Sequence, residues 1–115
     1  MAATTSTQSS FKPPQFDGTN FAYWKARMAI FLKSIDYVVW NMVQEECTPP
    51  TTDYDYWTNE AKREATLNAR AMNALYCALD ENEYNRISTC KMAYQVWHSL
   101  EILHEGTNKV KEAKF

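Results

Sequence analysis

Apolar residues recur along this chain at the three- and four-residue spacing of amphipathic helices, and the spacing restarts several times. The longest run extends from about residue 57 to about residue 79. Its apolar side contains Trp57, Ala61, Ala65, Asn68, Met72, Leu75, Tyr76 and Leu79. Residues that fall within one narrow arc at about 100° per residue share one face of a helix, so this run predicts a long amphipathic helix.

Two shorter helices are predicted before this long one. A polar turn precedes the first helix, and Thr19 or Asn20 is expected to cap it, because a short polar side chain can satisfy its unpaired amide groups. This helix ends near Ser34, and its apolar stripe is Phe21, Trp24, Met28, Phe31 and Leu32. Pro49 and Pro50 cannot continue a helix and therefore end the second one. Its apolar positions are Ile35, Val39, Trp40, Met42 and Val43.

Two further helices are predicted after the long one. Asp80 and Glu83 are three residues apart and form an aspartate version of a capping box for a short fourth helix. Ser88 or Thr89 is expected to start a fifth helix, which Gly106 ends. The apolar stripe of the fifth helix is Ala93, Val96, Trp97, Leu100 and Leu103.

Together these patterns predict an all-α protein, a compact bundle of about five helices formed by residues 11–106. The chain has two glycines and four prolines, too few for the frequent turns of a many-stranded sheet. Residues 1–10 are expected to be a flexible leader, and residues 107–115 to be a tail or the start of a truncated further helix. The expected core anchors are Phe21, Trp24, Met28, Trp40, Trp57, Met72, Leu75, Trp97 and Leu100.

Composition and charge narrow the possible function. The net charge of −2 gives the domain no general attraction to nucleic acid. Cys47, Cys77 and Cys90 are an odd set without CxxC spacing, which favours free thiols and a cytoplasmic location. No apolar run reaches the roughly 18 residues of a membrane span, so no membrane partner is expected.

No constellation of residues in the sequence predicts catalysis or a bound cofactor. His98 and His104 are six residues apart, on different faces of one helix, and are not expected to bind one metal ion. No Ser or Cys lies in a nucleophile elbow, and two isolated glycines cannot form a phosphate-binding loop. The acidic residues around Asp80 are expected to act as favourable charges at a helix N-terminus. The chain is therefore expected not to be an enzyme, with no metal, cofactor or small-molecule substrate.

The first helix carries apolar residues on the side opposite its main stripe as well. Tyr23 and Ile30 are seven residues apart on this far side, with alanines between the two faces. A helix that is apolar on two sides either passes through the middle of a bundle or offers its second side to another molecule. Two interpretations follow: Tyr23 and Ile30 are buried within the chain, or they form an assembly interface.

Several motifs occur in a defined order along the chain. F-D-G-T-N-F-x-x-W-K-x-x-M covers Phe16–Met28, and N-A-x-A-M-N-A-L covers Asn68–Leu75. A-Y-x-V-W-x-x-L covers Ala93–Leu100, and H-E-G-T covers His104–Thr107. In this order and spacing the motifs resemble the Gag polyprotein of plant copia-type LTR retrotransposons, over about residues 11–115.

The resemblance implies an all-helical domain like the N-terminal lobe of a retroviral capsid, without catalytic residues. Such a lobe is structural, and its partners are other Gag copies, with which it assembles into virus-like particles around the element's RNA. A second lobe and an RNA-binding CCHC zinc knuckle are expected beyond Phe115, so RNA binding is not carried over to this chain. The alternative is a domesticated lobe that holds a peptide or partner protein in a groove between helices.

Overall fold

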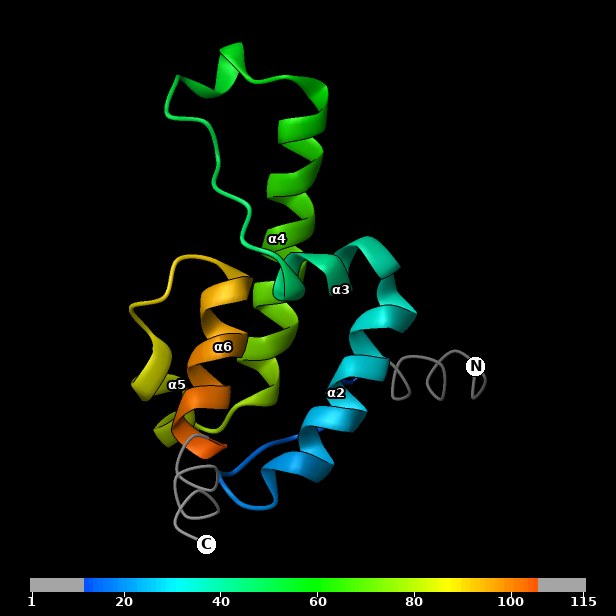
Figure 1. The fold of residues 1–115 in the computed structure, drawn as a ribbon, viewed down its shortest axis with the longest axis vertical. Coiled ribbons are helices and arrows are strands. Elements are labelled where there is room, and N and C mark those ends of the chain that lie inside the picture. The colour runs from blue at the N-terminus through cyan, green and yellow to red at the C-terminus, as the bar shows by residue number, and fades with distance from the viewer. Residues whose placement is uncertain (1–11, 106–115) are drawn as a thin grey trace, which may run out of the picture.

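Five α-helices and one short 3₁₀ helix make up most of the computed structural model, which describes residues 12–105 (Figure 1). They are α2 (Phe21–Ile35), α3 (Tyr37–Gln44), η1 (Tyr54–Tyr56), α4 (Asn59–Ala78), α5 (Glu81–Ile87) and α6 (Ala93–His104). The predicted all-α class with about five helices is confirmed. The expected leader and tail, with Phe11 and Gly106, lie outside the described residues.

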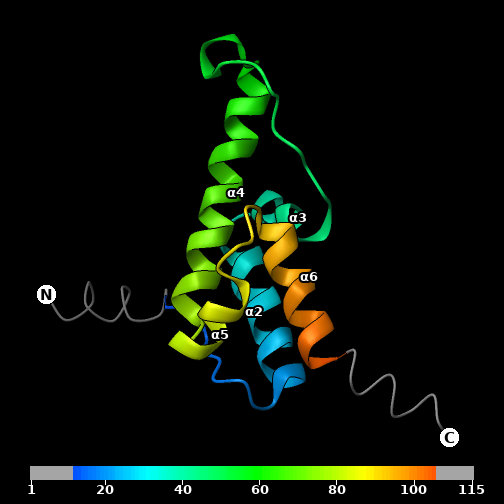
Figure 2. The same cartoon turned by 90° about the vertical axis from the view of Figure 1, so that its left-hand side faces the viewer.

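The helix α3 lies at the centre of the fold and contacts three of the other four α-helices of the described region. It packs against α2, α4 and α6, while α6 also packs against α4 and α5 (Figures 1 and 2). The 20-residue helix α4 is about 30 Å long, and its N-terminal half projects beyond the other helices. Residues 45–58 run from α3 up to the start of α4 beside this projecting half.

The core is one cluster of apolar side chains to which all five α-helices and Phe16 contribute. Six of the expected anchors are buried in it: Phe21, Trp24, Met28, Leu75, Trp97 and Leu100. Trp40 and Met72 are half-buried and pack against the cluster. The core therefore combines residues from the beginning and the end of the described region.

The expectation that Trp57 is a core anchor at the start of the long helix is wrong. The helix α4 begins at Asn59, because Thr58 is its N-cap and accepts a hydrogen bond from the Ala61 N–H at 3.0 Å. Trp57 lies before this cap and is only half-buried. Its indole N–H donates to the Thr52 carbonyl at 2.9 Å, which holds the side chain against the preceding loop.

The cap of α2 also differs from the prediction. Asn20 stands at the N-cap position, but its backbone is left-handed, with φ of 55°, and its side chain makes no capping hydrogen bond. The Asp17 carboxylate closes the turn instead, accepting from the Thr19 N–H at 3.0 Å and from the Thr19 hydroxyl at 2.6 Å. Short polar side chains therefore shape this turn without capping the helix.

The predicted start of the fifth helix at Ser88 or Thr89 is wrong, since α6 begins at Ala93. The Ala93 N–H donates to the Asn68 side-chain oxygen at 2.9 Å, so a residue on α4 satisfies an amide at the start of α6. Asn68 thereby fixes the position of α6 relative to α4.

Candidate interaction surfaces

The side of α2 that faces away from the core carries two large apolar side chains. Tyr23 is 59% exposed and Ile30 is 67% exposed, so the interpretation that they are buried within the chain is wrong. Ala22 and Ala26 are exposed beside them. We call Tyr23, Ala26, Arg27 and Ile30 the outer face of α2. Its role in assembly stays a prediction, because exposure alone does not identify what covers it.

The ionic residues of α2 are all basic, and they have different surroundings. The Arg27 guanidinium lies 5.4 Å from the centroid of the Tyr23 ring, at cation–π distance. Lys25 instead faces α6, where its Nζ is 2.7 Å from Glu101 and 2.9 Å from Glu105. Partial burial favours a lower pKa for Lys25, but hydrogen bonds to these two carboxylates outweigh it, and the pKa is raised. Arg27 is therefore the charged group that accompanies the apolar outer face.

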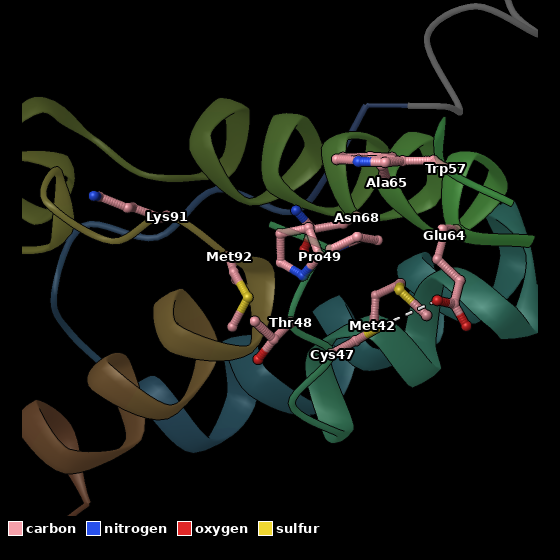
Figure 3. Close-up of a pocket in the computed structure, with 12 residues that line it drawn as sticks. Met42, Cys47, Thr48, Pro49, Trp57, Glu64, Ala65, Asn68, Lys91 and Met92 are labelled. Carbon is pink, nitrogen blue, oxygen red and sulfur yellow. Dashed lines mark hydrogen bonds between the residues drawn. The ribbon is translucent and has the colours of Figure 1, made fainter. Parts of the chain in front are cut away.

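A groove of about 160 Å³ lies where α3, the loop after it, α4 and the residues before α6 meet (Figure 3). The apolar side of the projecting half of α4 forms one wall with Ala61 and Ala65, and Met42 and Met92 contribute from α3 and from the start of α6. The remaining lining residues are Cys47, Thr48, Pro49, Pro50, Trp57, Glu64, Asn68 and Lys91. We call this cavity the α3–α4 groove. Its apolar lining suits it to an apolar side chain or peptide.

The polar groups of the α3–α4 groove do not form a reactive centre. Figure 3 shows Glu64 and Lys91 at opposite ends of it. The Cys47 thiol donates to a Glu64 carboxylate oxygen at 3.3 Å. Burial, and then Glu64, raise the pKa of Cys47, so the protonated thiol is favoured over the nucleophilic thiolate.

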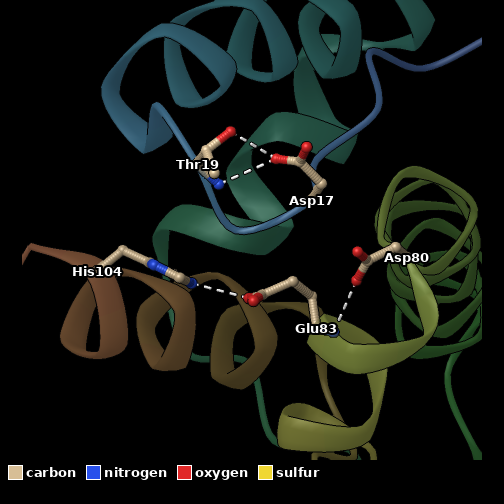
Figure 4. A network of polar contacts seen from close by, with 5 residues as sticks. All are labelled: Asp17, Thr19, Asp80, Glu83 and His104. Carbon is tan, nitrogen blue, oxygen red and sulfur yellow. Dashed lines mark hydrogen bonds and ion pairs between the residues drawn. The ribbon is translucent and has the colours of Figure 1, made fainter.

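A buried polar pair connects α5 with α6 (Figure 4). Glu83 is 4% exposed, and one of its carboxylate oxygens is 2.8 Å from His104 Nε2. The His104 ring stacks on Phe21 with centroids 5.2 Å apart and meets the edge of Phe16 at 4.9 Å. The pair therefore connects α5 with α6 and, through the contacts of His104 with Phe16 and Phe21, with the start of α2.

The cap at Asp80 could be predicted from the sequence, but the pair between Glu83 and His104 was not predicted. Asp80 caps α5 as predicted, accepting from the Glu83 N–H at 2.9 Å. The Glu83 side chain was expected to be one of several acidic charges at the helix N-terminus, and it pairs with His104 instead. The signal that could have found the pair is that His104 lies four residues after Leu100, on the apolar side of its helix.

Neither a metal-binding cluster nor a helix able to cross a membrane occurs in the part of the chain that the structure describes. Among residues 12–105, no group of three or more His, Cys, Asp and Glu side chains could hold a metal ion. His98 pairs with Glu101 at 2.8 Å, separately from the pair that His104 makes. In the described region no helix combines the length and the apolar character needed to cross a membrane.

The fold and its surfaces define a class of protein: an all-helical domain whose most distinctive features are an apolar outer helix face and an apolar groove. Residues 28–115 match the family model described as gag-polypeptide of LTR copia-type, and the chain therefore belongs to this family. The resemblance inferred from the motifs is confirmed. No curated protein and no solved structure matches the chain. Membership of a Gag family supports a structural role for the domain and is consistent with a protein that is not an enzyme.

Proposed function

We propose that this domain is a Gag capsid lobe that self-associates through the outer face of α2. As part of a longer Gag polyprotein it builds virus-like particles that package the element's RNA. The observation that carries the proposal is the outward exposure of Tyr23 and Ile30 on one side of a helix whose other side is anchored in the core. Membership of the copia-type Gag family supports the same role.

The outer face of α2 suits a weak, repeated contact. Burying one large apolar side chain contributes about 1.5–3 kcal/mol, so two such side chains give a modest gross gain before the cost of association is subtracted. A shell is built from many equivalent contacts, and its subunits do not need high affinity in each of them. A small apolar patch is therefore compatible with one weak contact among many in a shell.

The other partners follow from the same proposal. The net charge of −2 favours a lobe that contributes protein contacts, while a downstream zinc knuckle makes most contacts with RNA. We propose a cytoplasmic location, with other Gag copies as the main partner and without a membrane or a small-molecule substrate. No catalytic role is assigned to any residue.

The test compares two double variants whose altered side chains have similar exposed fractions. Tyr23→Glu with Ile30→Glu places two charges on the outer face of α2 and should shift the chain toward monomer. Tyr37→Glu with Ile102→Glu is the control, because these residues are 66% and 71% exposed on α3 and α6. Size-exclusion chromatography with light scattering, over a range of concentration and salt, measures association, and circular dichroism checks that helicity is unchanged.

The outcome separates the outer face from other exposed apolar residues. We expect the control to associate like the unmodified chain. An unmodified chain that stays monomeric at high concentration contradicts self-assembly by this lobe. Equal losses in both double variants contradict the assignment of the interface to α2.

A second candidate function is a domesticated lobe that binds a peptide or a partner protein in the α3–α4 groove. The apolar lining of the groove favours it, with Met42 and Met92 able to adapt to different side chains. Trp57 lines the groove and therefore reports on its occupation. Binding of an apolar peptide that changes the Trp57 fluorescence, in a chain that does not self-associate, would favour this function over assembly.

A further inference from the structure

We propose that Tyr23 of one copy inserts into the α3–α4 groove of the next copy, so that the contact between copies is head-to-tail. This inference rests on the proposed function, because it names the surface that receives the outer face of α2. Among the described residues that line the groove, none belongs to α2. One copy can therefore offer its Tyr23 to one neighbour and its groove to another.

The size of the groove fits one aromatic ring. A cavity of about 150 Å³ in a protein core admits benzene. The α3–α4 groove, at about 160 Å³, therefore has room for a single aromatic ring. Tyr23 presents such a ring on the outer face of α2. The groove is lined by apolar groups that suit the ring, and by Thr48, whose hydroxyl suits the hydroxyl of the tyrosine.

Charge gives the contact a direction. Arg27 lies against the Tyr23 ring, so it reaches the rim of the groove when the ring enters. Glu64 stands at one end of the groove, and Glu60 is close enough to Cys47 to help raise the pKa of that thiol. Opposite charges favour the orientation that places Arg27 at the Glu64 end. The reverse orientation brings Arg27 toward Lys91, at the other end, and is disfavoured.

The same charge argues against a symmetric contact of α2 with α2. A two-fold contact places each patch against its own copy. Arg27 lies between Tyr23 and Ile30 along the outer face, so such a contact gathers two guanidinium groups in one small interface. Like charges brought together in this way oppose association. The groove, with a carboxylate at its rim, is the better receptor for the outer face.

The decisive experiment mixes two variants that are each defective in a different half of the contact. Tyr23→Ala removes the ring, and Ala65→Trp fills the groove from within, because Ala65 is one of its lining residues. Each variant alone should raise the dissociation constant for self-association about tenfold or more. An equimolar mixture still has one intact ring and one intact groove. It should form a one-to-one dimer by light scattering, and no larger species.

The possible results distinguish this inference from the proposed function. If the unmodified chain associates and Ala65→Trp associates equally well, the groove is not the receptor, although self-assembly stands. If the mixture forms no dimer while the unmodified chain associates, the head-to-tail contact is also overturned. An unmodified chain that does not associate overturns both proposals.

A charge exchange provides a second test that leaves the groove unfilled, in case Ala65→Trp alters the helical content. Arg27→Glu and Glu64→Arg should each weaken self-association. The double variant should restore it, because opposite charges again meet at the rim of the groove. A double variant that is as weak as the single variants contradicts the proposed orientation.

Discussion

Replacing Trp24 by alanine tests whether the aromatic cluster at the start of α2 holds the segment before α2, α2 itself and α6 together. Trp24 is 2% exposed. Its ring stacks on Phe16 with centroids 4.9 Å apart and lies 5.9 Å from Trp97 on α6. Its indole N–H donates to the Pro14 carbonyl at 2.8 Å, so the substitution removes both packing and a hydrogen bond.

The expected cost follows from the burial of this side chain. Truncating a buried tryptophan to alanine destabilises a protein by about 3–5 kcal/mol. A domain of this size has a total stability of about 5–15 kcal/mol, so the loss is a large fraction of it. If the free energy of unfolding falls by about 2 kcal/mol for each molar of urea, this loss lowers the urea concentration at the midpoint of unfolding by roughly 2 M. Trp24→Phe keeps an aromatic ring, loses the N–H donor and should cost about 1–2 kcal/mol.

Urea unfolding followed by far-ultraviolet circular dichroism measures these differences. Trp57→Ala is the matched control, since it deletes the same side chain from a half-buried position outside the core. It should cost about 1 kcal/mol or less. Equal losses for Trp24→Ala and Trp57→Ala, or a loss below about 1 kcal/mol for Trp24→Ala, would refute the central role of this cluster.

Two further predictions concern the contacts around α4. Asn68→Ala removes the hydrogen bond to the Ala93 N–H and should lower the stability by about 1–2 kcal/mol in thermal unfolding. Asn68→Asp keeps an acceptor and should lose less, and an equal loss would contradict the capping role. Because the pKa of Cys47 is raised by burial and by Glu64, iodoacetamide at pH 8 should alkylate Cys47 more slowly than the exposed Cys77. Glu64→Gln should accelerate the labelling of Cys47 as measured by mass spectrometry, and an unchanged rate would assign the slow reaction to burial alone.

The helices could be predicted from the sequence because each packs one side on a single core. The stripe of α2 illustrates this, since Phe21, Trp24, Met28 and Leu32 recur every three or four residues and are all buried. The start of α6 could not be predicted in the same way. Its first amide is satisfied by Asn68, which is 25 residues earlier in the chain and on another helix. Local capping rules consider only neighbouring residues, so they favoured Ser88 or Thr89.

The candidate interaction surfaces could be predicted from the sequence less well than the helices, because these surfaces depend on tertiary structure. Ala61 and Ala65 continue the same apolar stripe as Leu75, and nothing in the pattern shows where the packed part of α4 ends. Ala61 and Ala65 lie in the half of α4 that projects beyond the other helices, and there they line the groove and not the core. The exposure of Tyr23 and Ile30 was likewise one of two alternatives that periodicity could not separate.

The packing of α2 with α6 in one core has a consequence for synthesis on the ribosome. Lys25 and Glu105, which bridge α2 and α6, are 80 residues apart. At about 5–20 residues per second, the ribosome takes roughly 4–16 seconds to translate this interval. During that time the nascent α2 lacks Trp97 and the other α6 partners of its inner stripe. The inner side of α2 can therefore be covered by its α6 partners only after α6 has left the exit tunnel.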